Sequence, residues 1–228
     1  MSLKDTLQKL KEHDRLKLAV VLSVSMFISI ALAMFRIYYS SRITYFFLTW
    51  NLLLACIPLI VSTFIVLNYR KLNHLVLLPL VMLWLLFFPN APYIVTDLFH
   101  LQPRHNVPVW YDLVLILFFS WNGLIIGFIS LLDIQYVLNR VYNKFIGWIF
   151  SVSALVLGAL GIYIGRFLRW NSWDVLTNPL RLLEDIAVRI ANPLYHHSAW
   201  AITLLFSLFL LTAYATILQM VKMRTKEI

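Results

Sequence analysis

The pattern of apolar and polar residues divides the chain into six long apolar segments joined by short polar connections. The segments cover approximately residues 16–35, 43–67, 75–95, 113–133, 148–166 and 199–220. Each one reaches or approaches the roughly 20 apolar residues that cross a bilayer core about 30 Å thick. The pattern predicts an all-α fold, a polytopic membrane helix bundle of about six transmembrane helices with short interfacial helices in addition.

The composition agrees with a location in the membrane. Hydrophobic residues make up 61% of the 228 residues and charged residues 13%, whereas a soluble domain carries about 25% charged residues. The longest stretch between apolar segments, residues 167–198, is too short to enclose its own core. We therefore expect one integral membrane domain over residues 1–228. Within it we expect a cytoplasmic interfacial helix in residues 1–15 and, in 167–198, an outer loop with an amphipathic helix.

The net charge of +9 is better explained by the orientation of the chain in the membrane than by binding to nucleic acid. The Lys and Arg residues gather at the ends of the apolar segments, where they contact lipid headgroups. No basic face is left outside the membrane, so no nucleic-acid binding is expected. With a cytoplasmic N-terminus, the inner connections hold 12 Lys and Arg and the outer connections 7. This bias predicts that both termini are cytoplasmic.

The first polar segment begins at the end of the third apolar segment, with the Pro-Asn-Ala-Pro sequence of residues 89–92. Each proline removes a backbone donor and disfavours helix before it, so we expect a break or kink there. If the helical phase survives, Asn90, Tyr93, Asp97 and His100 lie on one face. Polar groups in a lipid-embedded segment require a partner, and this alignment favours a lined cavity.

Simpler interpretations stay open for this part of the chain. Proline kinks are common in membrane helices, and Thr96 or Asp97 suits a capping position. Asp112, at the start of the fourth apolar segment, suits a helix N-terminus, where the helix dipole stabilises an anion. Asn122, deeper in that segment, suits either an interhelical hydrogen bond or a ligand contact.

The second polar segment, residues 165–174, follows the fifth apolar segment. If the helix continues that far, Arg166, Arg169, Trp170 and Trp173 share one face. Two guanidiniums beside indole rings form a clamp for a phosphate or carboxylate. The alternative is that the arginines snorkel to the interface and the tryptophans belong to an aromatic belt.

Small residues recur along one face of the fifth apolar segment, at Ala154, Gly158, Gly161 and Gly165. This stripe predicts close packing against a neighbouring helix.

Residues 179–190 predict an amphipathic helix on the outer surface. The apolar face, expected to contact lipid, consists of Leu182, Leu183, Ile186 and Ile190. The polar face holds i,i+4 pairs among Arg181, Asp185 and Arg189. The helix is either a lid over the site or a passive interfacial element.

Three sequences in this order resemble one family. They are Asn90-Ala-Pro92-Tyr93-Ile-Val-Thr96-Asp97-Leu-Phe-His100-Leu101, Trp110-Tyr111-Asp112, and Gly165-Arg166-Phe-Leu-Arg169-Trp170-Asn171-Ser172-Trp173-Asp174. The family is an uncharacterised group of bacterial integral membrane proteins, known as a domain of unknown function. The resemblance extends from about residue 45 to 220. It implies a bacterial cell membrane protein with several spans, and it implies no activity, substrate or catalytic residue.

The first functional hypothesis is a membrane enzyme that acts at the outer leaflet on an anionic or lipid-linked substrate. Asp97 and His100 are the candidate catalytic base and acid, and they are also the candidate ligands if a metal binds. No motif calls for a metal, and the sequence assigns no cofactor. The candidate substrate-binding residues are the polar groups of the two segments and the fourth span: Asn90, Tyr93, Asp112, Asn122, Arg166, Arg169, Asn171 and Asp174.

Two alternatives belong to other functional classes. A small-solute transporter fits the proline-interrupted third span and the polar residues Asn51 and Asn122, although the two halves of the chain share no repeat. An accessory or scaffold subunit of a membrane complex fits the small mass outside the membrane. The enzyme hypothesis predicts that Asp97, His100 and Arg166, together with Arg169 and Asp174, surround one outward-opening cavity.

Overall fold

The computed structural model describes residues 15–104 and 106–224. Six spans within these residues are long and apolar enough to cross a membrane. They are α2 (Arg15–Ser40), α3 (Phe47–Asn68), the combination of α4 (His74–Phe87), α5 (Asn90–Tyr93) and the 3₁₀ helix η1 (Ile94–His100), α6 (Val109–Val141), α7 (Lys144–Phe167) and α10 (His197–Arg224). Two shorter helices, α8 (Asp174–Thr177) and α9 (Pro179–Ala191), connect α7 to α10. The predicted all-α membrane bundle is confirmed, while the interfacial helix predicted for residues 1–15 falls almost entirely outside the described residues.

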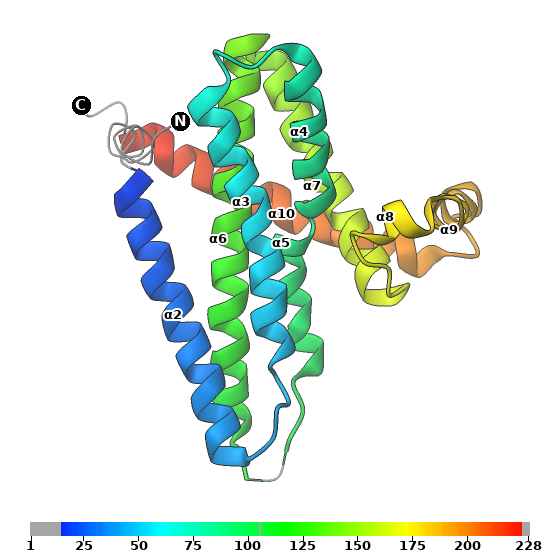
Figure 1. The fold of residues 1–228 in the computed structure, drawn as a ribbon. Coiled ribbons are helices and arrows are strands. Elements are labelled where there is room, and N and C mark those ends of the chain that lie inside the picture. The colour runs from blue at the N-terminus through cyan, green and yellow to red at the C-terminus, as the bar shows by residue number, and fades with distance from the viewer. Residues whose placement is uncertain (1–14, 105, 225–228) are drawn as a thin grey trace.

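Helix α6 is the central element of the bundle. It packs against α2, α3, α5, η1 and α7, and α10 packs against α7. In Figure 1 the start of α2 and the α3–α4 and α6–α7 connections lie toward the top, the α2–α3 connection lies at the bottom, and α8 and α9 project to the side. Asparagine caps begin two of the helices, because the side chains of Asn73 and Asn143 accept from the amides of Val76 and Ile146.

The outer helices expose large apolar side chains, as expected where the solvent is lipid. Phe27 on α2 is 71% exposed and Leu204 on α10 is 63% exposed. Such faces are stable only in hydrocarbon, because water would order around them. The bilayer is therefore a partner of this chain.

The segment that joins α4 to η1 packs closely against glycines on α6 and α7. A Cβ atom on Gly123 would lie 2.5 Å from the carbonyl oxygen of Ala91, and one on Gly161 would lie 2.7 Å from the Pro89 ring. The small-residue stripe thus packs closely against a neighbour, as predicted, and the neighbour is residues 88–93. This packing brings Asn90 and Tyr93 alongside α7.

Alanine at Gly161 is expected to lower the free energy of unfolding by about 1–3 kcal/mol, since the rigid Pro89 ring leaves no room for a methyl group. Alanine at Gly165 is the matched control on the same helix. Its Cβ would lie 3.2 Å from the edge of the Tyr93 ring, a less severe contact, so this variant should lose less stability than Gly161→Ala. Equilibrium unfolding by SDS in mixed micelles measures both. Equal stabilities for the two variants would contradict the tight contact at Pro89.

Candidate functional site

A cavity of about 600 Å³ lies among α3, the α4–α5–η1 span, α7, the loop after α7, and α9. This volume is in the range of sites that enclose small organic ligands. Both polar segments contribute to its wall, which consists of Trp50, Asn51, Leu54, Leu85, Leu86, Pro89, Asn90, Tyr93, His100, Gly161, Ile164, Gly165, Arg166, Arg169, Trp170, Asn171, Ser172, Trp173, Val175, Leu182 and Ile186.

The prolines of residues 89–92 tighten the third span without breaking it. Phe88 and Pro89 keep helical dihedral angles, and the chain continues through α5 into the 3₁₀ helix η1. Asn90 Nδ2 donates to the carbonyl of Phe87 at 2.9 Å, which satisfies an acceptor near the first proline. Because the helical phase largely survives, Asn90, Tyr93 and His100 all line the cavity.

Arg166, in the last turn of α7, joins that helix to η1. Its Nε donates to Thr96 Oγ1 at 2.9 Å, Nη2 donates to Asp97 Oδ1, and Nη1 lies 2.8 Å from His100 Nε2. Its guanidinium carbon also lies 4.3 Å from the centroid of the Tyr93 ring, in cation–π range. A guanidinium has only donors, so His100 Nε2 accepts here and a neutral ring carries its proton on Nδ1.

Asp97 lies behind the wall of the cavity. It is 0% exposed, and its two oxygens accept from Arg166 and, at 2.9 Å, from Asn51 Nδ2. The predicted pairing of Asp97 as base with His100 as acid requires a direct contact or a shared substrate. Instead, the Arg166 guanidinium contacts both side chains, and Asp97 serves to hold Arg166.

Arg169 lines the cavity, but its backbone is not helical as the sequence indicated. Helix α7 ends at Phe167, and Arg169 has a φ of 61°, the left-handed conformation that more often ends helices with glycine. The predicted shared helical face of the two arginines and two tryptophans is therefore wrong, although all four side chains line the cavity. Within residues 15–104 and 106–224, no carboxylate forms an ion pair with Arg169.

The loop after α7 is fixed by polar contacts at both ends. Asn90 Nδ2 donates to Ser172 Oγ at 2.9 Å, and Trp170 Nε1 donates to Asp185 Oδ2 at 2.9 Å. Asp174 does not line the cavity, because its Oδ2 accepts from the amide of Asn171 at 2.6 Å and so closes the turn. Asn171 lines the cavity as predicted, and Ser172 is a wall residue that sequence reasoning missed.

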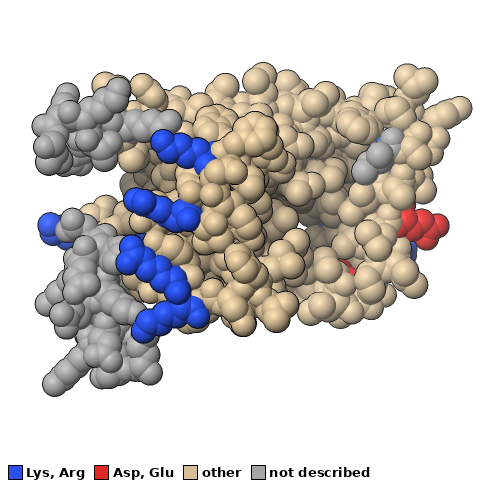
Figure 2. Space-filling model, turned by 90° about the horizontal axis from the view of Figure 1, so that it is seen from above, with Lys and Arg blue, Asp and Glu red and all other residues tan. Residues whose placement is uncertain are grey.

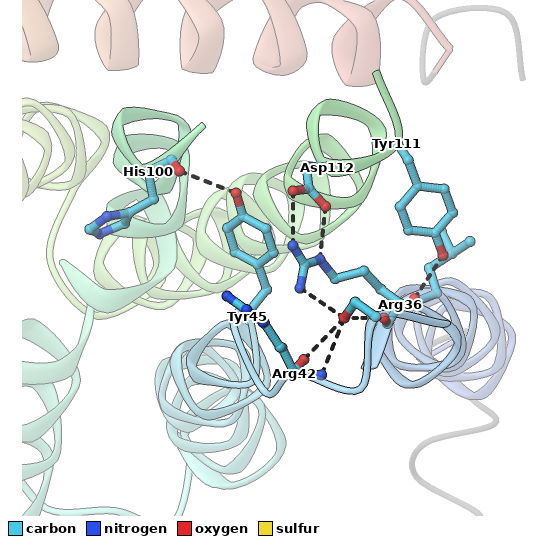
Figure 3. A network of polar contacts seen from close by, with 8 residues as sticks. Arg36, Arg42, Tyr45, His100, Tyr111 and Asp112 are labelled. Atoms are coloured by element: carbon cyan, nitrogen blue, oxygen red, sulfur yellow. Dashed lines mark hydrogen bonds and ion pairs between the residues drawn. The ribbon is translucent and has the colours of Figure 1, made fainter. Parts of the chain in front are cut away.

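Asp112 also lies outside the cavity, in a second buried ion pair (Figure 3). Arg36 Nε and Nη2 donate to its two oxygens at 2.9 and 3.1 Å, and the two side chains are 2% and 1% exposed. The pair joins the end of α2 to the start of α6. Asp112 therefore has a structural partner, and its predicted contact with a substrate is not at this cavity.

Tyr45 connects this ion pair to the site. Its ring lies between the guanidiniums of Arg36 and Arg104, at 4.7 and 5.0 Å. Its hydroxyl donates to the carbonyl of His100 at 3.1 Å, as Figure 3 shows. Burial, followed by the charge of Asp112, raises the pKa of Tyr45. The hydroxyl therefore stays protonated at neutral pH and keeps this bond to the end of η1.

Asn122 is the fourth predicted site residue that does not line the cavity. Its Nδ2 donates to Ser29 Oγ and to the carbonyl of Phe118, each at 2.9 Å. Of the two roles left open for it, the interhelical bond is the one observed, and this bond ties α6 to α2.

Helix α9 covers one side of the cavity. Leu182 is buried, and both Leu182 and Ile186 line the cavity, so the prediction that they face lipid is wrong. Leu183 remains 61% exposed, and the predicted pair of Asp185 and Arg189 is present at 3.3 Å. The hydrogen bond from Trp170 to Asp185 holds the helix in this position.

No group of three or more His, Cys, Asp or Glu side chains within the described ranges is arranged to hold a metal ion. Asp97 and His100, the two candidate ligands, both contact the Arg166 guanidinium. A cation beside that guanidinium would be repelled, and the donor set therefore does not suit a metal.

Comparison with known proteins places the chain in a family. Residues 50–213 match a family described as "Protein of unknown function (DUF1361)". The chain belongs to this family. The DUF1361 match includes every residue that lines the cavity, from Trp50 to Ile186. No curated protein and no solved structure gives a significant match.

Proposed function

We propose that the cavity binds an anionic amphiphile, with the negatively charged group at Arg169. The observation that carries this proposal is the charge of the wall. Two arginines line the cavity, and none of the described Asp or Glu side chains does. The charge of Arg166 is offset by Asp97. Arg169, by contrast, is exposed, and its guanidinium, a planar fork of N–H donors, has no carboxylate partner among the described residues. Such a fork matches the oxygens of a phosphate or carboxylate.

The rest of the wall suits the apolar part of the same ligand. Leu54, Leu85 and Leu86 come from the spans, and Trp170 and Trp173 from the loop. Tryptophan rings favour the depth at which headgroups meet acyl chains. A purely ionic solute would leave these surfaces without a partner, so a lipid or lipid-linked anion is the best match.

We further infer that the site opens toward the extracytoplasmic side of a bacterial cell membrane, and that residues 1–228 form one membrane domain. Arg70, Lys71, Arg140 and Lys144 are exposed at the α3–α4 and α6–α7 connections. Figure 2, which is seen from above, shows Lys and Arg side chains on the face of the molecule that carries these connections. Positive charge is retained on the cytoplasmic side, which supports cytoplasmic termini.

The contacts favour binding over acid–base chemistry at this site. Both oxygens of Asp97 are engaged, and so is Nε2 of His100. Neither group is free to take a proton from a substrate unless Arg166 moves.

Replacing Arg169 with glycine tests the proposal with two readouts of opposite sign. Glycine accepts a positive φ without cost, so the free energy of unfolding should rise by about 1 kcal/mol. Affinity for phosphatidic acid should fall about tenfold or more, because a charge-assisted contact is lost. Equilibrium binding in nanodiscs measures the second effect.

Three comparisons make the result specific. Neutral diacylglycerol should bind weakly to the wild type, inorganic phosphate should compete poorly with phosphatidic acid, and Arg181→Gly, on the exposed face of α9, should bind normally. Equal affinity of Arg169→Gly and wild type for phosphatidic acid would overturn the proposal. Strong competition by inorganic phosphate would reassign the ligand to a soluble anion.

A further inference from the structure

A second, smaller pocket lies between α7, α9 and α10. Its volume is about 180 Å³, and it is lined by Val156, Leu157, Leu160, Tyr163, Ile164, Ile186, Arg189, Ala199, Trp200 and Thr203. Only apolar atoms face its interior. Arg189 and Thr203 therefore border the pocket through their carbon atoms, and a hydrocarbon is the one class of occupant that this wall satisfies.

The second pocket shares part of its wall with the first cavity. Ile164 on α7 and Ile186 on α9 line both spaces. These two side chains, each in contact with both spaces, are the boundary between the polar site and the apolar pocket. A ligand with its charged group at Arg169 would pass its chain across this boundary.

The outer wall of the pocket reaches the membrane-facing surface of α7. Val156 is 39% exposed and Leu157 is 46% exposed. A hydrocarbon chain therefore has a route from the bilayer into the pocket that does not cross water.

We propose that this pocket holds a hydrocarbon chain of the ligand whose anionic group lies at Arg169. This inference rests on the proposed function and narrows it: the ligand is a lipid anion with a long chain, held at two points. The charge of Arg169 selects the anionic headgroup of the lipid, and the space beside Leu160 selects its hydrocarbon chain. Affinity should therefore depend on chain length as well as on head charge.

The experiment compares phosphatidic acids with identical headgroups and either long or short acyl chains, binding to purified full-length protein in nanodiscs. Wild type should favour the long-chain lipid by about tenfold or more. Leu160→Trp fills the pocket and should remove this preference, while affinity for the short-chain lipid is retained. Leu160→Ala enlarges the pocket and should increase the preference. Leu204→Trp, on an exposed face of α10, is the control and should behave as wild type.

The outcomes separate this inference from the function on which it rests. If wild type binds phosphatidic acid through Arg169 but both Leu160 variants keep the wild-type preference for long chains, the pocket does not hold the chain. If Arg169→Gly binds both lipids as wild type does, the proposed function itself fails. If Leu160→Trp does not fold, Leu160→Ala still decides the question, because loss of side-chain volume changes the pocket without overpacking it.

Discussion

Alanine in place of Asp97 is expected to destabilise the bundle by about 3–5 kcal/mol and to weaken binding of anionic lipid by displacing the cavity wall around Arg166. Asp97 is fully buried and holds the Arg166 guanidinium, with support from Asn51. Removing one partner of a buried ion pair leaves the other charge uncompensated in a medium of low dielectric constant. Arg166 would then lose the contact that positions it beside Tyr93 and His100. SDS unfolding in mixed micelles measures the change in stability.

The matched control removes both charges. Because a buried pair is often replaced by apolar side chains at little cost, Asp97→Leu combined with Arg166→Leu should recover most of the lost stability. It should not restore full affinity, since the contacts by which Arg166 positions Tyr93 and His100 in the cavity wall are missing. If Asp97→Ala alone is as stable as wild type, the carboxylate does not anchor Arg166, and the arrangement of the site described here is incorrect.

Alanine in place of Asp112 should lower the free energy of unfolding by a similar amount, about 3–5 kcal/mol, because it also leaves a buried charge without its partner. The Arg36 guanidinium would remain buried beside Tyr45 without its carboxylate. Binding should differ from the Asp97 result: Asp112 neither lines the cavity nor contacts Arg166, so protein that remains folded should bind phosphatidic acid with near-normal affinity.

Asp185→Ala is the control for the Asp112 experiment. The ion pair between Asp185 and Arg189 is partly exposed, with side-chain exposures of 36% and 22%, and it should contribute less than about 1 kcal/mol. The hydrogen bond from Trp170, lost in the same variant, should contribute about 1 kcal/mol more. A cost for Asp112→Ala no greater than that for Asp185→Ala would show that the Arg36 pair is not a major support of the α2–α6 contact.

The spans could be predicted from the sequence because hydropathy and helix length are local properties. The predicted segment 148–166 corresponds to α7, Lys144–Phe167, and the segment 16–35 to α2, Arg15–Ser40. The differences are at the ends, where polar residues such as Arg36 continue the helix once they find a partner. The glycine spacing on α7 also predicted close packing, which the contact with Pro89 provides.

The candidate site could be predicted in part, because helical periodicity determines which side chains share a face. Asn90, Tyr93 and His100 line the cavity through this periodicity, and Arg166 reaches them from the end of α7. Asp97 belongs to the same region but lies one layer deeper, since η1 is a 3₁₀ helix and its side chains follow a tighter turn.

The remaining features depend on contacts that a single sequence does not contain. Arg36 and Asp112 are 76 positions apart and meet only through the packing of α2 on α6. Asn51 was noted as a polar residue in a span, but its bond to Asp97 follows from the packing of α3 against η1. Nothing in the residue type predicts a positive φ at Arg169, because this conformation favours glycine or asparagine.

The central claim is that the cavity holds a lipid anion through Arg169, and native mass spectrometry of gently purified protein tests it most directly. Wild type and Arg169→Gly are the appropriate pair, because the glycine variant is expected to be at least as stable as wild type. Wild type is expected to retain an anionic lipid that the variant has lost. Retention of the same lipid by both proteins, or of no anionic species by wild type, would contradict it.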